Sequence, residues 1–108
     1  MNTEFIVVSV TFPSVSEAEK CIEDLLKHHL VSCCQMYPIQ SIYRWKGKIE
    51  KADEISVILK SKQSLFSKIK ECILKNHSYE VPEILSYPII DGYEPYLAWI
   101  KEETEIVL

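Results

Sequence analysis

The chain has 108 residues, of which 47% are hydrophobic and 26% charged, a composition typical of one globular domain, and we expect a single domain over residues 1–108. The formal net charge of -4 lacks the basic excess of nucleic-acid-binding proteins, so no nucleic-acid partner is expected. The longest apolar run, residues 5–12, is interrupted by Ser9 and Thr11, is too short to cross a bilayer and follows no basic residue, which favours a cytoplasmic protein without a membrane partner.

The first predicted elements are a strand and a helix. Alternating apolar residues predict a strand over residues 5–12 with one wholly apolar face, and Pro13 ends it. Ser14 and Ser16 are each followed three residues later by glutamate, the pattern of a capping box at a helix start. The helix that follows carries apolar residues at a 3.6-residue period and ends near His28-His29.

A long β-hairpin is predicted next. Its strands run from about residue 31 to 45, with an irregularity at Pro38, and from about residue 48 to 60. Only Lys46-Gly47 separates them, and glycine takes the positive φ of a tight turn without a Cβ clash. Tyr43 and Trp45 share one face of the first strand, and near the tip they have little core of their own to bury in. We therefore expect that face to dock on another surface.

The second half of the chain reads as helix, loop, strand and helix. Apolar residues from Leu65 to Ile73 have helical spacing, and residues 77–83 form a loop because Pro82 forces extended backbone before it. A fourth strand is predicted over residues 84–90, and Pro95 suits the first turn of a last helix. Residues 105–108 are expected either to add a short strand or to fray.

The fold class predicted by this order is α+β, a ferredoxin-like βαββαβ antiparallel sheet with helices on one face plus a C-terminal helix. If Val8, Val57 and Leu85 point toward the helices, a set of aliphatic residues points away from them: Phe5, Val7, Ile58, Ile84 and Ile90. Apolar residues on the uncovered face of a small sheet favour an oligomer.

His77 is the strongest candidate for chemistry, because it precedes Tyr79, Glu80 and Glu83 in the loop and imidazole with carboxylates suits Cu(II) or Zn(II). The alternative is a solvated histidine at a helix end, which is also the simpler explanation of His28-His29.

Cys21 and Cys72 lie on apolar stripes and are expected in the core. Of Cys33 and Cys34 one must face away from the helices, as a thiolate ligand or an interface residue; free thiols are expected. No nucleophile with an adjacent base is readable, so we expect no enzyme.

Three motifs together resemble the divalent-cation tolerance (CutA) family. They are Tyr43-x-Trp45-x-Gly47-x-Ile49-Glu50, His77-x-Tyr79-Glu80-Val81-Pro82-Glu83 and Tyr96-Leu97-x-Trp99, and the resemblance covers nearly the whole chain. It implies a homotrimer similar in architecture to PII signalling proteins, in which hairpins pair with the neighbouring subunit. It further implies a role in tolerance to divalent metals, copper in particular, without an established reaction or an obligatory cofactor.

The chain departs from the copper-binding members that it resembles. Val10 stands where they can carry a cysteine, and Asn76-His77 stands where they can carry a His-His pair. The resemblance therefore implies a reduced site, formed by His77 with Glu80 or Glu83, and with Cys33 across a subunit boundary.

Two functions are expected from this reading. The first is a non-enzymatic homotrimer of divalent-cation tolerance that binds Cu(II) or another divalent cation weakly. The alternative is a PII-like trimer that senses a small molecule in inter-subunit clefts lined by Tyr43, Trp45, Lys60 and Glu83, with Tyr79 and Trp99 as further cleft or interface residues. A reaction at His77 or at a cysteine is the third and weakest reading.

Overall fold

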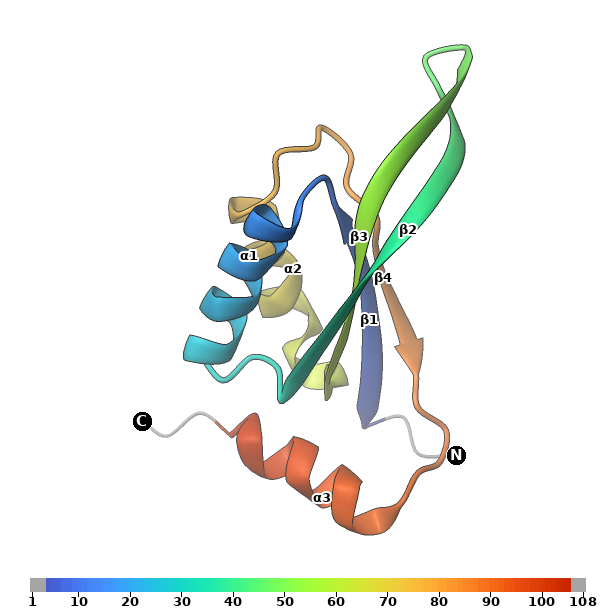
Figure 1. The fold of residues 1–108 in the computed structure, drawn as a ribbon. Helices are drawn as coiled ribbons and strands as arrows, with labels where there is room; N and C mark the ends of the chain where they lie inside the picture. Colours follow the sequence, from blue (N-terminus) through green and yellow to red (C-terminus); the bar gives the residue numbers. More distant parts are fainter. Residues whose placement is uncertain (1–3, 106–108) are drawn as a thin grey trace.

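A four-stranded antiparallel sheet forms the centre of the protein in the computed structural model, which describes residues 4–105 (Figure 1). The strands are β1 (Phe5–Phe12), β2 (Cys33–Trp45), β3 (Lys48–Lys62) and β4 (Ile84–Pro88), in the order β2-β3-β1-β4. Helices α1 (Val15–Lys27) and α2 (Phe66–Lys75) cover one face, and a short 3-10 turn, η1 (Gln63–Leu65), precedes α2. Helix α3 (Glu94–Glu103) ends the described chain. The predicted ferredoxin-like order is confirmed, with element ends shifted by up to two residues.

Helix α1 begins and ends where its sequence indicates. The Ser14 side chain accepts a hydrogen bond from the backbone N–H of Glu17 at 3.3 Å, which satisfies one of the free donors of the first turn. At the other end, His29 takes the left-handed conformation (φ 56°) that reverses the chain after a helix. Within the described chain, no helix is long and apolar enough to span a membrane.

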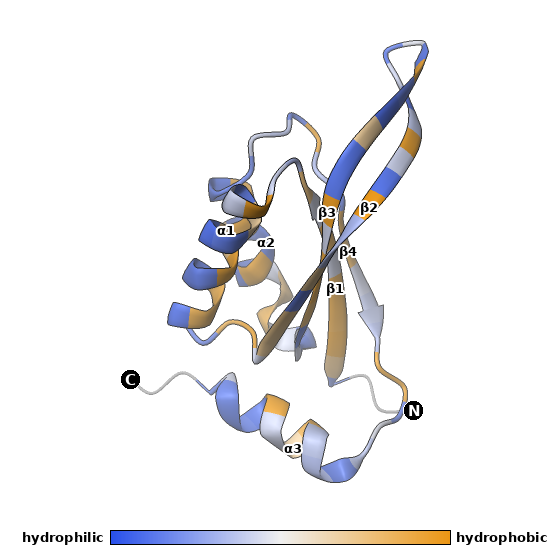
Figure 2. Cartoon of the chain, viewed as in Figure 1, coloured by the Kyte–Doolittle hydropathy of each residue, from blue (hydrophilic) through white to orange (hydrophobic). Residues whose placement is uncertain are grey.

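The main core lies between the sheet and the two covering helices. Val8, Val57 and Leu59 from the sheet are fully buried against Ile69 and Ile73 of α2 and the apolar side of α1. Figure 2 shows the same arrangement as hydropathy, with the hydrophobic sides of both helices turned toward the sheet. The alternation of β1 and the helical periods predicted this layer because each apolar face can be buried only against another.

The facing of β4 was predicted wrongly. Ile84 pairs with Val10 and packs against the main core, whereas Leu85 pairs with Ser9 and is 47% exposed on the opposite face. When neighbouring residues of a strand are both apolar, a shift of the pairing by one residue exchanges which of them faces the core. The sequence pattern alone therefore does not decide which face is buried.

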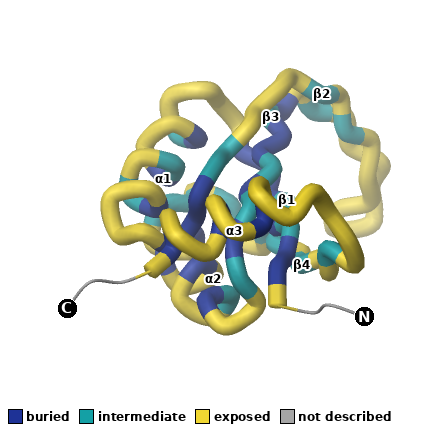
Figure 3. Tube along the Cα trace, turned by 90° about the horizontal axis from the view of Figure 1, so that it is seen from below, coloured by how far each residue is buried: buried dark blue, intermediate teal, exposed yellow. Residues whose placement is uncertain are grey.

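Helix α3 covers the far end of the sheet on the face opposite α1 and α2. Leu97 and Ile100 bury Phe5 in a second small cluster, and α3 crosses this end in Figure 3. Phe5 points away from α1 and α2 as predicted, but its side chain is covered by α3 of the same chain rather than by another subunit. Ile90 lies beyond β4, and the predicted tail strand is not seen at Glu105, while residues 106–108 lie outside the described residues.

The β2–β3 hairpin is regular along its whole length. Pairing continues without a bulge from Cys33 opposite Lys60 to Trp45 opposite Lys48, so the irregularity predicted at Pro38 is absent from it. Pro38 is tolerated because β2 is an edge strand, where a missing N–H costs no ladder bond on the free side. The tight turn and the positive φ of Gly47 (80°) are as predicted; Lys46 also has a positive φ (48°), which gives the geometry of a type I′ turn.

Candidate functional site

The loop of residues 77–83 crosses the end of the sheet and is anchored by His77. The His77 side chain is only 1% exposed, and its ring stacks on Phe12 with centroids 4.5 Å apart. Its Nε2–H donates to the Thr11 carbonyl at 2.6 Å, and its Nδ1 accepts the Tyr79 backbone N–H at 3.2 Å. These partners assign the Nε2–H tautomer and occupy both ring nitrogens.

Glu17 of α1 holds the next residue of the loop. Its carboxylate accepts hydrogen bonds from the Ser78 backbone N–H at 3.0 Å and from the Ser78 hydroxyl at 3.1 Å. The same oxygen lies 3.7 Å from His77 Nδ1, too far for a hydrogen bond. The first half of the loop is therefore tied to both β1 and α1.

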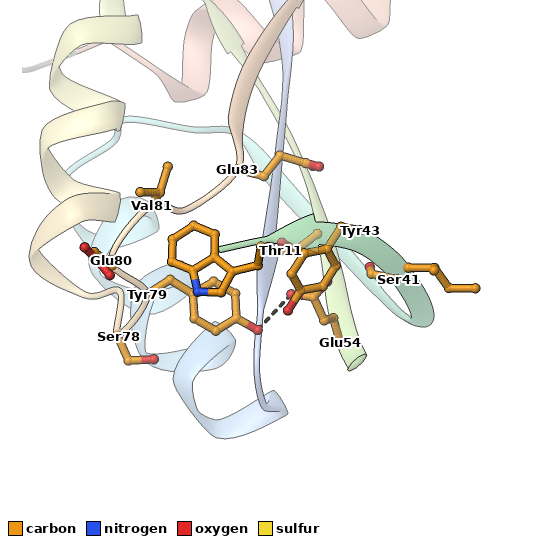
Figure 4. Close-up of a pocket in the computed structure, with 11 residues that line it drawn as sticks. Thr11, Ser41, Tyr43, Glu54, Ser78, Tyr79, Glu80, Val81 and Glu83 are labelled. Carbon is orange, nitrogen blue, oxygen red and sulfur yellow. Dashed lines mark hydrogen bonds between the residues drawn. The ribbon is translucent and has the colours of Figure 1, made fainter. Parts of the chain in front are cut away.

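Tyr79 connects the loop to the hairpin strand β3. Its hydroxyl donates to the Glu54 carboxylate at 2.8 Å, the bond drawn in Figure 4. Burial, and after it the hydrogen bond to Glu54, raises the pKa of Tyr79, so the phenol keeps its proton and remains the donor. Glu54 itself is only 7% exposed.

The far half of the loop contacts the open sheet face and the hairpin tip. Ser9 donates to the Glu83 carboxylate at 3.0 Å. Lys46, in the hairpin turn, lies 3.8 Å from a Glu80 oxygen and 5.5 Å from the centroid of the Trp45 ring. Both charged side chains of that pair are 72% exposed, so the contact closes the tip over the loop only weakly.

A cavity of about 580 Å³ lies between the hairpin and this loop (Figure 4). Its walls are aromatic, aliphatic and acidic, and it is lined by Thr11, Ser41, Ile42, Tyr43, Trp45, Glu54, Ser78, Tyr79, Glu80, Val81 and Glu83. Five residues singled out in the sequence meet here: Tyr43, Trp45, Tyr79, Glu80 and Glu83. Glu54 was not predicted from the sequence. One signal was available: Glu54 is a charged residue on the same face of its strand as Ser56 and Ile58.

Lys60, Cys33 and Trp99 lie elsewhere in the chain. Lys60 is six residues from Glu54 along β3, about 20 Å at the usual rise of a strand, and its ammonium donates to Gln35. Cys33 pairs with Lys60 and lies beside Tyr96, whose pKa is raised by burial and then by this thiol. Trp99 contacts Tyr96, with ring centroids 5.6 Å apart. Within one chain these residues form a separate group near α3.

The predicted metal ligands are not assembled in a single chain. Cys33 lies level with Val7 in the sheet register, whereas His77 contacts Thr11, about 13 Å further along β1. Among residues 4–105, no three His, Cys, Asp or Glu side chains form a group that could hold a metal ion. His77 also has no lone pair free, since Nδ1 accepts the Tyr79 N–H. One described chain alone does not fit a divalent ion at this place.

The four cysteines are free thiols. Burial raises the pKa of Cys21 and of Cys34 to about 12, and raises that of Cys72 to about 11, so these thiols stay protonated. Cys21 and Cys72 lie in the core as predicted, and Cys34 packs against it. Cys33 is the member of the pair that faces away from α1 and α2.

Known proteins resemble this chain over almost its whole length. Residues 6–103 match the family model of the CutA1 divalent ion tolerance protein. The divalent-cation tolerance protein CutA of Pyrococcus horikoshii is 40% identical over 100 residues, which cover 93% of this chain and 98% of that protein. The chloroplastic protein CutA of Arabidopsis thaliana is 37% identical over 92% of this chain and 55% of its own length. The structure of the periplasmic divalent cation tolerance protein CutA from Archaeoglobus fulgidus superposes with a TM-score of 0.92 at 36% identity, covering 94% of this chain and 99% of that one.

Replacement of His77 by alanine is expected to lower the free energy of unfolding by about 2–4 kcal/mol, because a buried ring and two hydrogen bonds are lost together. Urea denaturation measures the change. His28→Ala is the matched control, since His28 is an exposed histidine at a helix end and should cost less than about 1 kcal/mol. Equal losses in the two variants would contradict the anchoring role of His77.

Proposed function

This chain belongs to the CutA1 divalent ion tolerance family, and from that premise we propose that it serves divalent-cation tolerance as a non-enzymatic homotrimer that binds divalent metal weakly. The single observation that carries the assembly is an uncovered apolar sheet face. We propose that the protein acts in the cytoplasm, although the relatives named above include a periplasmic and a chloroplastic protein.

The open face consists of residues in register on the side away from α1 and α2: Val7, Tyr37, Ile58, Leu85 and Tyr87. Leu85, Tyr87 and Tyr37 are 47%, 50% and 51% exposed, which leaves large apolar side chains half in water. Complete burial of such a side chain stabilises by about 1.5–3 kcal/mol. Copies of the same chain supply the apolar partner surface, and the free edge of β2 offers them backbone hydrogen bonds.

The non-enzymatic part of the proposal is supported by the family and by the protonated state of the buried thiols, which removes them as nucleophiles at neutral pH.

Native mass spectrometry is expected to show three chains together, at three times the chain mass of 12.6 kDa. Tyr87→Glu should shift the protein toward monomers, because it puts a charge on the open face beside Val7. Tyr93→Glu is the matched control, since Tyr93 is 78% exposed and lies outside the sheet. A monomeric parent protein, or equal dissociation of both variants, would contradict the proposed assembly.

Weak metal binding follows from the state of the proposed ligands. Glu80 and Glu83 are exposed on the loop, whereas His77 would have to release the Tyr79 N–H before its Nδ1 could bind an ion. Cys33 can join them only from a neighbouring subunit. The cost of opening the His77 contacts is subtracted from any affinity for the ion, so tight binding is not expected.

Calorimetric titration with Cu(II) tests this assignment. Because free thiols can reduce Cu(II), the titration is repeated with Zn(II), which they do not reduce. The double variant Glu80→Gln/Glu83→Gln should weaken binding at least tenfold, since it removes both accessible carboxylates. Glu71→Gln/Glu94→Gln makes the same change of charge away from the loop and should leave binding unaltered. Unchanged affinity in the loop variant would show that the ion binds elsewhere.

A second candidate function is the sensing of a small molecule, and the cavity of about 580 Å³ favours it. That volume lies within the range of about 300–1,000 Å³ that is usual for small-molecule sites. The hairpin forms one wall of the cavity, and the pairing of hairpins between subunits that the family resemblance implies would couple occupancy of the cavity to contacts between subunits.

A further inference from the structure

We propose that the cavity between the hairpin and the 77–83 loop binds an organic cation that carries N–H groups on an aliphatic body, of the alkylammonium or alkylguanidinium class. This inference rests on the small-molecule function just described and deepens it. It does not depend on metal binding.

The charge of the cavity selects a cation. Glu54, Glu80 and Glu83 bring three carboxylates to its walls, and none of the described residues that line it is cationic. The chain as a whole has a net charge of -4, which adds attraction for a cation at long range. An anionic ligand would meet repulsion from both sources.

Glu54 presents an incompletely paired carboxylate at the floor of the cavity. The residue is only 7% exposed, and one of its oxygens accepts the Tyr79 hydroxyl. Within residues 4–105 the other oxygen accepts no hydrogen bond, and because no buried side-chain oxygen there lacks a partner, this oxygen is open to solvent at the cavity that the side chain lines. This oxygen can therefore accept a hydrogen bond from a ligand, and the N–H of an ammonium or guanidinium group forms the strongest type of hydrogen bond with a carboxylate.

The aromatic walls favour an organic cation over a bare metal ion. Tyr43, Trp45 and Tyr79 line the same space as the carboxylates, and ring faces attract alkylammonium and guanidinium groups. A divalent metal instead needs several oxygens converging on one point, and no such group of three ligands exists in the described chain.

At the edge of the cavity, one of the protein's own cations already lies between an aromatic ring and a carboxylate. The Lys46 ammonium lies 5.5 Å from the centroid of the Trp45 ring and 3.8 Å from Glu80. The exposed pair is weak enough for a ligand to compete with it. The volume of the cavity exceeds that of a charged head group, and the rings of Tyr43 and Trp45 supply apolar surface for an aliphatic body.

The test is a titration of the protein in its native oligomeric state with n-butylammonium, n-butanol and n-butyrate, three probes of equal chain length and different charge. Backbone and indole N–H signals are followed by NMR. We expect n-butylammonium to bind at least tenfold more tightly than the other two and to shift the indole signal of Trp45. The indole of Trp99, at the other end of the molecule, is the internal control and should not move. Tetramethylammonium, which has no N–H, should bind more weakly than n-butylammonium.

Glu54→Gln should weaken n-butylammonium binding at least tenfold, while Glu71→Gln, the same change on the exposed side of α2, should not alter it. The amide oxygen introduced by Glu54→Gln can still accept the Tyr79 hydroxyl; should that variant fail to fold, Tyr43→Leu provides the second test. Equal binding of n-butanol or n-butyrate, a response at Trp99, or full affinity in Glu54→Gln would overturn the proposal. Preferred binding of n-butyrate would overturn the cation class and keep the small-molecule function, whereas no binding of any probe would count against both.

Discussion

The arrangement of this protein's candidate site depends on the burial of one imidazole ring. His77 lies on Phe12 and donates to the carbonyl of Thr11, at the place where β1 ends and the chain turns toward α1. The ring also accepts the N–H of Tyr79, which fixes the direction in which the loop leaves α2. From there Tyr79 reaches Glu54 and Glu83 reaches Ser9, so the loop side of the cavity follows from a single anchored residue.

The same anchoring explains why a histidine beside two glutamates is not by itself a metal site. A ligand nitrogen must offer a free lone pair, and the lone pair of Nδ1 is engaged by the backbone. The glutamates of the loop instead point to the cavity and the hairpin. In this molecule the 77–83 loop connects α1, the sheet and the hairpin through its hydrogen bonds. Its two glutamates line the cavity that these contacts help to form.

Much of the fold could be predicted from sequence because local patterns determine it: the alternation of β1, the capping serine of α1 and the glycine of the hairpin turn each specify one element. The facing of β4 could not, because Ile84 and Leu85 are equally apolar and only long-range pairing with β1 decides between them. For the site, the aromatic pair and the acidic loop were found from their motifs. The role of Glu54 depends on contacts between the loop and β3, and the place of Trp99 depends on the packing of α3, which sequence spacing does not contain. The distance of Lys60 and Cys33 from the hairpin tip does follow from the predicted two-residue turn, which pairs Cys33 with Lys60, and it was overlooked.

The most direct test of this account is the protonation pattern of the His77 ring, read from a long-range ¹H–¹⁵N correlation spectrum of the imidazole at pH 8. The hydrogen bonds predict a single Nε2–H tautomer, with a ring proton that exchanges slowly because it is bonded to the Thr11 carbonyl and shielded by Phe12. A mixture of tautomers, or a ring proton that exchanges as fast as in free histidine, would show that the ring is not anchored and would contradict the account.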